Sequence, residues 1–364
     1  MTGRILILGA TGRMGHAAAE AFRDAGWTVL SFVRPGADSR AAPGTTVIEG
    51  DPLDPASVLK AASGGVDVVL NALNPPFKDW RAQAMPFLEV SIAAAKAAGA
   101  TLIFPGNVYG YGKKMPDVID EDTPMQPTTS KGQIRVAMEQ RLQEATEQEG
   151  LRTIILRAGD FFGGEGRGSW FDLVVVRDIR MAVVRYPGPL DVMHSWAYLP
   201  DLAQTIVRLA ERRETLKPFE TFCFPGHSVT GAQMLSTLQK IAEQPLKLRS
   251  FPWWALRIFG LFSVQLRELV EIAYLWRVPH RLSGDKLRAT IGDIPQTAFR
   301  EAVHSSLDAL FGYGGRHAAT KSGTAASAPA DTAPAGGEPP AAGSQPDGTE
   351  PPNQAPPNSS SPSR

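Results

Sequence analysis

Short apolar runs alternate with helix-like segments through the first part of the chain. The runs, rich in β-branched residues, are 4–8, 28–33, 45–48, 66–72, 101–104 and 152–156. The segments between them, which carry apolar residues at helical spacing, include 16–26, 55–62, 84–99 and 132–148. Strands that alternate with helices form parallel βαβ units. The pattern therefore predicts an α/β fold built on a doubly wound parallel sheet.

The pattern becomes less regular after Leu156. We expect helices over 170–178, 200–213, 231–243 and 253–276, and short strands near 182–185 and 219–224. These segments predict a smaller mixed α/β lobe over 158–315. It would cover the carboxyl edge of a sheet domain over 1–157, because open α/β sheets bind their ligands at that edge. Residues 316–364 are rich in Pro, Ala, Gly and Ser, so a disordered tail is expected there.

The charge balance argues against polyanionic partners. The 364 residues include 37 basic and 37 acidic side chains, and the basic ones are not striped with aromatic residues. No overall field therefore draws the chain to nucleic acid or to an anionic membrane, and a small-molecule ligand is expected. The sequence has no evident metal-ligand pattern, so no metal is expected.

The most apolar stretch, 251–276, is interrupted by charged residues. They leave it well short of the about 20 apolar residues that a membrane span needs. Its spacing predicts a buried amphipathic helix that packs on the core or on a partner, which leaves a homodimer open. A helix that lies in a membrane interface is the alternative.

Cysteine content and the N-terminal sequence bear on the compartment. Cys223 is the single cysteine, which excludes an internal disulfide, and its apolar neighbours indicate a small buried hydrophobe. The apolar run near the N-terminus is only five residues long and is followed by glycines rather than by a cleavage-type sequence. A cytoplasmic setting is therefore expected.

The glycines of ILILGATGRMGHAAAEAF mark a phosphate-binding turn. Gly9, Gly12 and Gly15 lie between a predicted strand and a predicted helix. The first permits a tight turn, the second lets the backbone approach a pyrophosphate, and the third lets helix and strand pack closely. Free amides at the helix start then face the anion. In its βαβ context the pattern predicts dinucleotide binding by a Rossmann fold, and an ordinary tight turn is the alternative.

Basic residues near this turn favour NADP(H) over NAD(H). Arg34 follows the second strand, about 20 residues beyond the turn, where an acidic residue would bind the ribose of NAD. An arginine there suits the 2′-phosphate of NADP, and Arg13 within the turn adds a second positive charge. A solvated loop residue is the alternative interpretation of Arg34.

The spacing GxxGxxG resembles that of the extended and atypical short-chain dehydrogenase/reductase superfamily. The stretches NVYGYG and EDTP resemble those of members related to nucleotide-sugar epimerases and dehydratases, and the likeness covers about residues 4–310. In such proteins the third strand ends at the adenine and the fourth ends beside the nicotinamide. The resemblance implies cofactor contacts at Gly9, Thr11, Gly12, Arg13, Met14, Gly15, Arg34, Asp51, Leu53, Asn71, Ala72 and Pro105.

The residues of the superfamily's usual acid/base chemistry are replaced. Pro105 stands in place of a serine or threonine, and Lys131 and Arg135 stand in place of the tyrosine and lysine of YxxxK. KxxxRxxxE is instead similar to isoflavone-reductase-like members, where the lysine is regarded as the acid/base of an NADPH-dependent reduction. The two side chains are one helical turn apart, and the arginine's charge would favour a neutral lysine. A solvated helix face with an Arg135–Glu139 ion pair is the alternative.

Two further stretches, LRAGDFFGGEGRG and VMHSWAYLPDLA, are expected to reach the substrate together with NVYGYG. The expected pocket residues are Asn107, Tyr109, Asp160, Phe161, Phe162, His194 and Trp196. Histidine titrates near neutrality, so His194 could donate a proton. A purely structural role is the alternative for each of these residues.

These features together predict an NADPH-dependent reductase of a small organic substrate, with Lys131 as the proton relay. A non-catalytic sensor of NADP(H) that regulates a protein partner is the first alternative. A nucleotide-sugar epimerase or dehydratase is the second, and the missing hydroxyl groups count against it.

Overall fold

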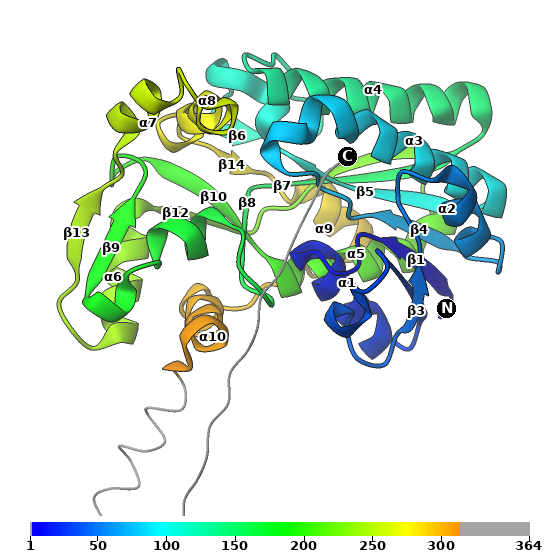
Figure 1. The fold of residues 1–364 in the computed structure, drawn as a ribbon, viewed down its shortest axis with the longest axis horizontal. Helices are drawn as coiled ribbons and strands as arrows, with labels where there is room; N and C mark the ends of the chain where they lie inside the picture. The colour runs from blue at the N-terminus through cyan, green and yellow to red at the C-terminus, as the bar shows by residue number, and fades with distance from the viewer. Residues whose placement is uncertain (1, 314–364) are drawn as a thin grey trace, which may run out of the picture. The chain divides into compact units, whose positions relative to one another are not determined.

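A seven-stranded parallel sheet lies at the centre of the protein (Figure 1). The computed structural model describes residues 2–313, so the tail expected over 316–364 lies outside the described residues. The strand order is β11-β7-β5-β4-β1-β2-β3, and every pairing is parallel. The strands are β1 Arg4–Leu8, β2 Thr28–Val33, β3 Thr46–Glu49, β4 Val68–Asn71, β5 Thr101–Asn107, β7 Arg152–Ala158 and β11 Phe219–Cys223. The predicted doubly wound α/β fold is confirmed.

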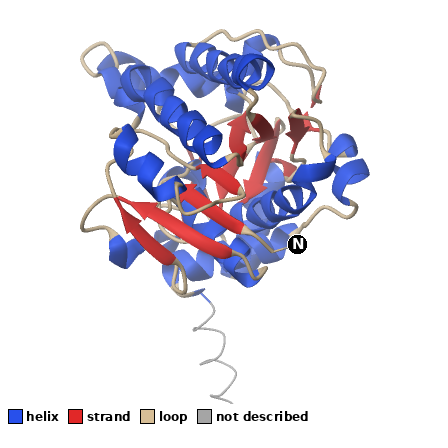
Figure 2. Ribbon diagram, turned by 90° about the vertical axis from the view of Figure 1, so that its right-hand side faces the viewer, coloured by secondary structure: helices blue, strands red, loops and turns tan. Residues whose placement is uncertain are grey.

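Helices cover both faces of this sheet (Figure 2). One face packs against α1 (Arg13–Asp24), α5 (Leu199–Arg212) and α9 (Asp285–Ile291). The other face packs against α2 (Pro55–Ala62), α3 (Trp80–Ala98) and α4 (Ser130–Glu149). Because both faces are covered, the central strands are continuous apolar runs rather than alternating ones.

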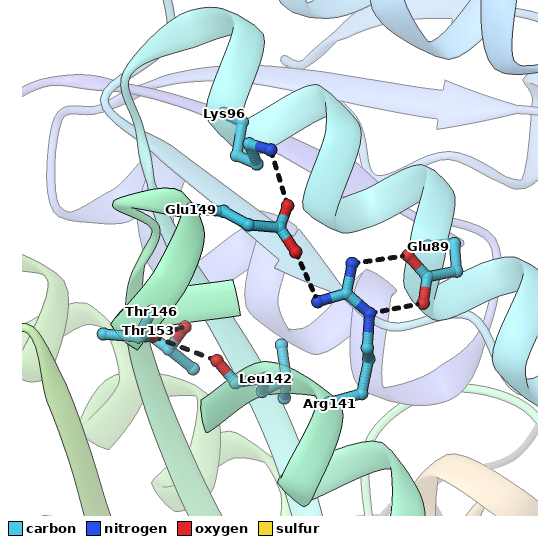
Figure 3. A network of polar contacts seen from close by, with 7 residues as sticks. All are labelled: Glu89, Lys96, Arg141, Leu142, Thr146, Glu149 and Thr153. Atoms are coloured by element: carbon cyan, nitrogen blue, oxygen red, sulfur yellow. Dashed lines mark hydrogen bonds and ion pairs between the residues drawn. The ribbon is translucent and has the colours of Figure 1, made fainter. Parts of the chain in front are cut away.

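A network of charged side chains joins α3 to α4 (Figure 3). The guanidinium of Arg141 donates to both carboxylate oxygens of Glu89, at 2.8 and 3.0 Å, and to Glu149 at 2.8 Å. Lys96 of α3 donates to the second oxygen of Glu149 at 2.6 Å. At the other end of α4, the Thr129 hydroxyl accepts from the Gly132 amide at 3.1 Å and caps the helix. The charged network thus fixes the second half of α4 against α3, and the Thr129 cap satisfies an amide of its first turn.

Smaller sheets, formed mostly by the second half of the chain, complete the fold. β8 (Asp160–Phe162), β10 (Met193–Tyr198) and β12 (His227–Thr230) form one; β9 (Val183–Tyr186) pairs with β13 (Lys247–Ser250), and β6 (Val118–Ile119) pairs with β14 (Arg281–Leu282). α6 (Gly231–Ala242) and α10 (Phe299–Phe311) pack with them around the buried Trp196 and Trp276. The short helical turns are η1 Asp38–Arg40, η2 Phe77–Asp79, η3 Tyr109–Lys114, η4 Phe171–Val175, η5 Ile179–Met181 and η6 Arg213–Thr215.

The prediction of a single helix over 253–276 is wrong. The segment forms α7 (Trp253–Phe259), α8 (Val264–Glu271) and the turn η7 (Ile272–Trp276). The chain reverses at Gly260, where a Cβ atom would lie only 2.8 Å from the Leu256 carbonyl oxygen and 3.3 Å from Arg267 Cα. Only η7 is buried throughout, whereas α7 and the turn after it expose large apolar side chains. Within residues 2–313, no helix is long and apolar enough to cross a membrane.

Candidate active site

The glycine turn between β1 and α1 has the geometry of an anion cradle. Gly9 has a φ of +87°, and its carbonyl oxygen accepts from the Gly12 amide at 3.0 Å. A Cβ atom on Gly15 would lie 2.2 Å from that same oxygen, so only glycine allows α1 to start this close to β1. Gly12 precedes the helix and has no side chain to satisfy its first amides. The amides are thus available to a phosphate group.

A cavity of about 740 Å³ extends from this turn along the carboxyl edge of the sheet. Such a volume lies within the usual range for small-molecule and cofactor sites. Most of the residues expected from the sequence line it. These are Gly9, Thr11, Gly12, Arg13, Met14, Arg34, Asn71, Ala72, Pro105, Asn107, Tyr109, Arg135, Asp160 and Phe161.

Seven of the expected residues are not among those that line the cavity: Gly15, Asp51, Leu53, Lys131, Phe162, His194 and Trp196. Gly15 lies beneath the turn. Asp51 accepts from the Leu53 amide at 2.9 Å, and both are exposed, while Pro52 between them reaches the cavity. Phe162 and Trp196 belong to a buried aromatic cluster, where their ring centroids are 6.1 Å apart.

Four arginines besides Arg135 line the cavity: Arg13, Arg34, Arg40 and Arg167. Arg34 and Arg40 are exposed at its wall, and no ion pair involves either of them within residues 2–313. Arg13 is instead paired with the buried Asp172 at 3.3 Å and donates to the Gly163 carbonyl at 2.6 Å. Burial lowers the pKa of Arg13, and Asp172 counteracts that shift. Arg40 was missed because it lies on η1, away from any strand end that a sequence pattern marks.

Arg135 brings a half-buried positive charge to the wall of the cavity. Its guanidinium lies over the ring of Trp80 at 4.9 Å and over that of Phe104 at 5.2 Å. Burial lowers its pKa, and the nearby Tyr109 and Glu139 counteract the shift. Its Nε atom is buried without a hydrogen-bond partner in the described part of the chain. A half-buried cation that faces a cavity favours an anionic or strongly polar ligand there.

Lys131 does not share the cavity wall with Arg135. Its side chain is 1% exposed, and Nζ lies 2.5 Å from Oε2 of Glu268 on α8, which is itself buried. The ammonium also lies 5.9 Å from the centroid of the Trp80 ring. Next to this pair, Glu271 accepts from the Ser130 amide at 3.1 Å. Two acidic residues of α8 therefore meet the positive end of α4, where the helix dipole favours them.

Asp160 and His194 form a pair of which only the carboxylate reaches the cavity. His194 Nε2 lies 2.9 Å from Asp160 Oδ2, and Nδ1 lies 3.3 Å from the Leu275 carbonyl oxygen. Both neighbours are oxygen acceptors, while a neutral imidazole has a single N–H. The imidazole is thus held between two acceptors, and its N–H can donate to either of them. The imidazole stacks on Trp276 at 4.2 Å, which fixes its orientation.

Burial shifts the pKa values of two groups near this pair. Burial and the nearby His194 lower the pKa of His280 to about 4, so His280 is neutral. On the cavity wall, burial raises the pKa of the Tyr109 phenol well above its usual range, and Asp160 adds to that shift. The phenol therefore stays protonated and can donate a hydrogen bond to a ligand.

Comparison with known proteins identifies the family of this chain. The family model described as the NAD dependent epimerase/dehydratase family matches residues 5–223, more than half of the chain. The chain belongs to this family. The resemblance noted in the sequence is thereby confirmed.

Other members and relatives extend the comparison. A curated Streptomyces protein, "3-diazoavenalumate denitrifying reductase", is 31% identical over 177 residues, which are 44% of this chain and 57% of that protein. The chain thus spans little more than half the length of this relative. A putative epimerase from Burkholderia cenocepacia has the same fold, with a TM-score of 0.68, 22% identity and coverage of 84% of this chain and 97% of that one. UDP-glucose 4-epimerase of Thermus thermophilus, solved with NAD, gives a TM-score of 0.65 and 17% identity. The match covers 85% of this chain and 99% of that one.

Proposed function

We propose that this family member is an NADP(H)-dependent reductase of a small organic anion. The observation that carries the proposal is the cavity itself, whose wall includes a glycine turn, two exposed arginines, Arg34 and Arg40, and the half-buried cation Arg135. A curated relative named a reductase supports the same class of reaction. A nicotinamide cofactor, when bound, supplies the hydride.

The residues of the cavity fit such a cofactor. The turn at Gly9 and Gly12 would hold the two linked phosphates through backbone amides. Arg34 and Arg40 would hold the 2′-phosphate, because both are exposed at the wall and charge-assisted hydrogen bonds to phosphate are strong. Asn71 and Ala72 of β4 and Pro105 of β5 line the stretch that leads to the substrate end.

The substrate end of the cavity offers a cation to bind the substrate and a carboxyl group to donate a proton. Arg135 would bind the anionic group, since it is a half-buried cation on the wall whose Nε has no hydrogen-bond partner in the described part of the chain. We propose Asp160, supported by His194, as the proton donor in place of Lys131, because Asp160 lines the cavity and Lys131 is paired with Glu268 behind it. Tyr109 would orient the substrate as a hydrogen-bond donor.

The name of the Streptomyces relative suggests a second type of substrate, a diazo compound. Replacing a diazonium group by hydrogen takes one hydride onto carbon and releases dinitrogen, and the nicotinamide becomes oxidised. This reaction consumes no proton, so it needs no acid at the position where the superfamily has tyrosine. A carbonyl or enone reduction, by contrast, takes both a hydride and a proton.

We expect Arg34→Ala and Arg40→Ala each to weaken NADPH binding by about 10- to 100-fold and NADH binding by less than threefold, since about 1.5–3 kcal/mol of charge-assisted bonding to phosphate is lost. Isothermal titration calorimetry with both cofactors measures this. Arg300→Ala, exposed on α10, is the matched control and should change neither affinity. Equal weakening of both cofactors would contradict the assignment of these arginines to the 2′-phosphate.

We expect Asp160→Asn to lower the kcat for carboxylate-bearing ketones and enones by about 10²- to 10⁴-fold, the usual contribution of a positioned acid, with NADPH affinity unchanged. With a diazo substrate such as 3-diazoavenalumate, kcat should stay the same. NADPH oxidation at the nicotinamide absorbance reports both, and Asp191→Asn, an exposed aspartate, is the control. Tight NADPH binding without turnover on any of these substrates would favour the sensor.

A further inference from the structure

The hairpin of α7 and α8 exposes the largest apolar side chains of the described protein. We call its outer surface the α7–α8 tip. The tip side chains are 48–86% exposed: Trp254, Ile258, Phe259, Leu261, Phe262 and Val264. These residues lie close together in sequence, on α7, on α8 and on the turn between them, and the two helices lie side by side in Figure 1. Contiguous apolar patches of this kind mark a binding surface.

The base of the hairpin is firmly packed, so the tip is held outward. Trp253 is buried and its indole N–H donates to the Pro187 carbonyl at 2.5 Å. The ring of Trp253 lies 4.8 Å from that of Phe251 and 5.8 Å from that of Trp170. On α8, Glu268 is tied to Lys131. Because both helices are anchored from inside, the exposed side chains have no core position to fold back into.

Along the segment 244–267, which contains the tip, the charged side chains are all basic. Between Glu243 and Glu268 the chain has no acidic residue, and it has four basic ones, all exposed: Lys247, Arg249, Arg257 and Arg267. Within residues 2–313, no ion pair neutralises any of the four. A chain of zero net charge thus carries a local positive field beside its apolar corner.

We propose that the α7–α8 tip docks on a membrane surface that contains anionic phospholipid. Tryptophan and phenylalanine prefer the interface between water and hydrocarbon, and exposed arginines beside them attract anionic headgroups. A second copy of the chain fits less well, because a two-fold contact through the tip would bring the same arginines together. The tip would enter the headgroup region without spanning the bilayer.

Docking would place one wall of the cavity next to lipid. Trp170 lines the cavity and contacts the aromatic base of α7, and Leu269 of α8 lines it too. Leu173, half exposed, belongs to the same wall. The surface thus gives amphiphilic molecules dissolved in the membrane a short route to the site. This inference concerns the surface alone and does not depend on the proposed reaction.

Co-sedimentation of the full chain with vesicles tests the proposal. We expect the protein to pellet with vesicles of phosphatidylcholine and phosphatidylglycerol in a 7:3 ratio, and to pellet much less with phosphatidylcholine alone or at high salt. The double variant Phe259→Ser/Phe262→Ser should reduce the partition coefficient at least about 10-fold, because both side chains are lost from the apolar contact. Arg257→Ala/Arg267→Ala should reduce it about 30-fold on the anionic vesicles.

Met181→Ser, which alters a 69% exposed apolar residue outside the tip, is the matched control and should leave vesicle binding unchanged. The four side chains altered in the two double variants are exposed, so the variants should fold, and circular dichroism verifies this. Absence of binding to anionic vesicles would overturn the proposal. So would a concentration-dependent dimer in analytical ultracentrifugation that Phe259→Ser/Phe262→Ser abolishes while vesicle binding is unaffected.

Discussion

Lys131→Met is expected to lower the free energy of unfolding by about 3–5 kcal/mol, because it leaves the Glu268 carboxylate buried without its cation. Urea unfolding followed by circular dichroism measures the change. The double variant Lys131→Met/Glu268→Leu should recover most of the loss, since an apolar pair can replace a buried ion pair. Lys286→Met removes an equally short but more exposed pair with Glu220, and should cost less than about 1 kcal/mol.

The same variants separate the two roles open to Lys131. If the double variant folds and keeps its turnover on ketones and enones, Lys131 is a structural residue that positions α4 against α8. If it folds and loses turnover while NADPH affinity stays intact, Lys131 is the proton relay expected from its place in the sequence. A double variant no more stable than Lys131→Met would instead contradict the ion-pair argument.

Gly15→Ala is expected to weaken binding of both NADPH and NADH by more than about 100-fold. The added methyl group would lie 2.2 Å from the Gly9 carbonyl oxygen and 2.9 Å from Ala10 Cα, both backbone atoms that cannot rotate away. α1 must therefore move off β1, which takes the amides away from the phosphates and adds about 1–3 kcal/mol of packing strain. Calorimetry measures the affinities, and thermal unfolding reports the strain.

The matched control is Gly64→Ala, where the nearest atoms to a new Cβ are 3.9 Å away, in ordinary contact. It should change neither affinity nor stability appreciably. Should Gly15→Ala bind both cofactors normally, the close approach of α1 to the turn would not be what holds the phosphates, and the proposed cofactor site would lose its main support.

The sheet was predictable from the sequence because its strands are buried on both faces. β1 and β4 are uninterrupted apolar runs, and the glycines after β1 can be interpreted without knowing any partner. The cofactor end of the cavity follows from the same local signals. Arg40 and Trp80 were missed because they lie on or beside short helical turns, which leave little periodicity to detect.

The arrangement of the substrate end could not be predicted, because it depends on contacts between residues that are far apart in the sequence. Lys131 and Glu268 are separated by 137 residues, so nothing near KGQIRVAME signals the pair. The segment 251–276 has helical spacing throughout, yet the close approach at Gly260 folds it into a hairpin. Spacing also could not distinguish a buried apolar face from an exposed one, which is why the segment was expected to be buried against the core or a partner.

The placement of β11 at the edge of the central sheet affects how the protein is made. β11 pairs with β7, but 60 residues of intervening chain, including β8 and β10, are synthesised between Ala158 and Phe219. Until they have left the ribosome, β7 has an open edge ready to pair with other nascent chains. Expression conditions that slow translation through this stretch would prolong that vulnerable interval.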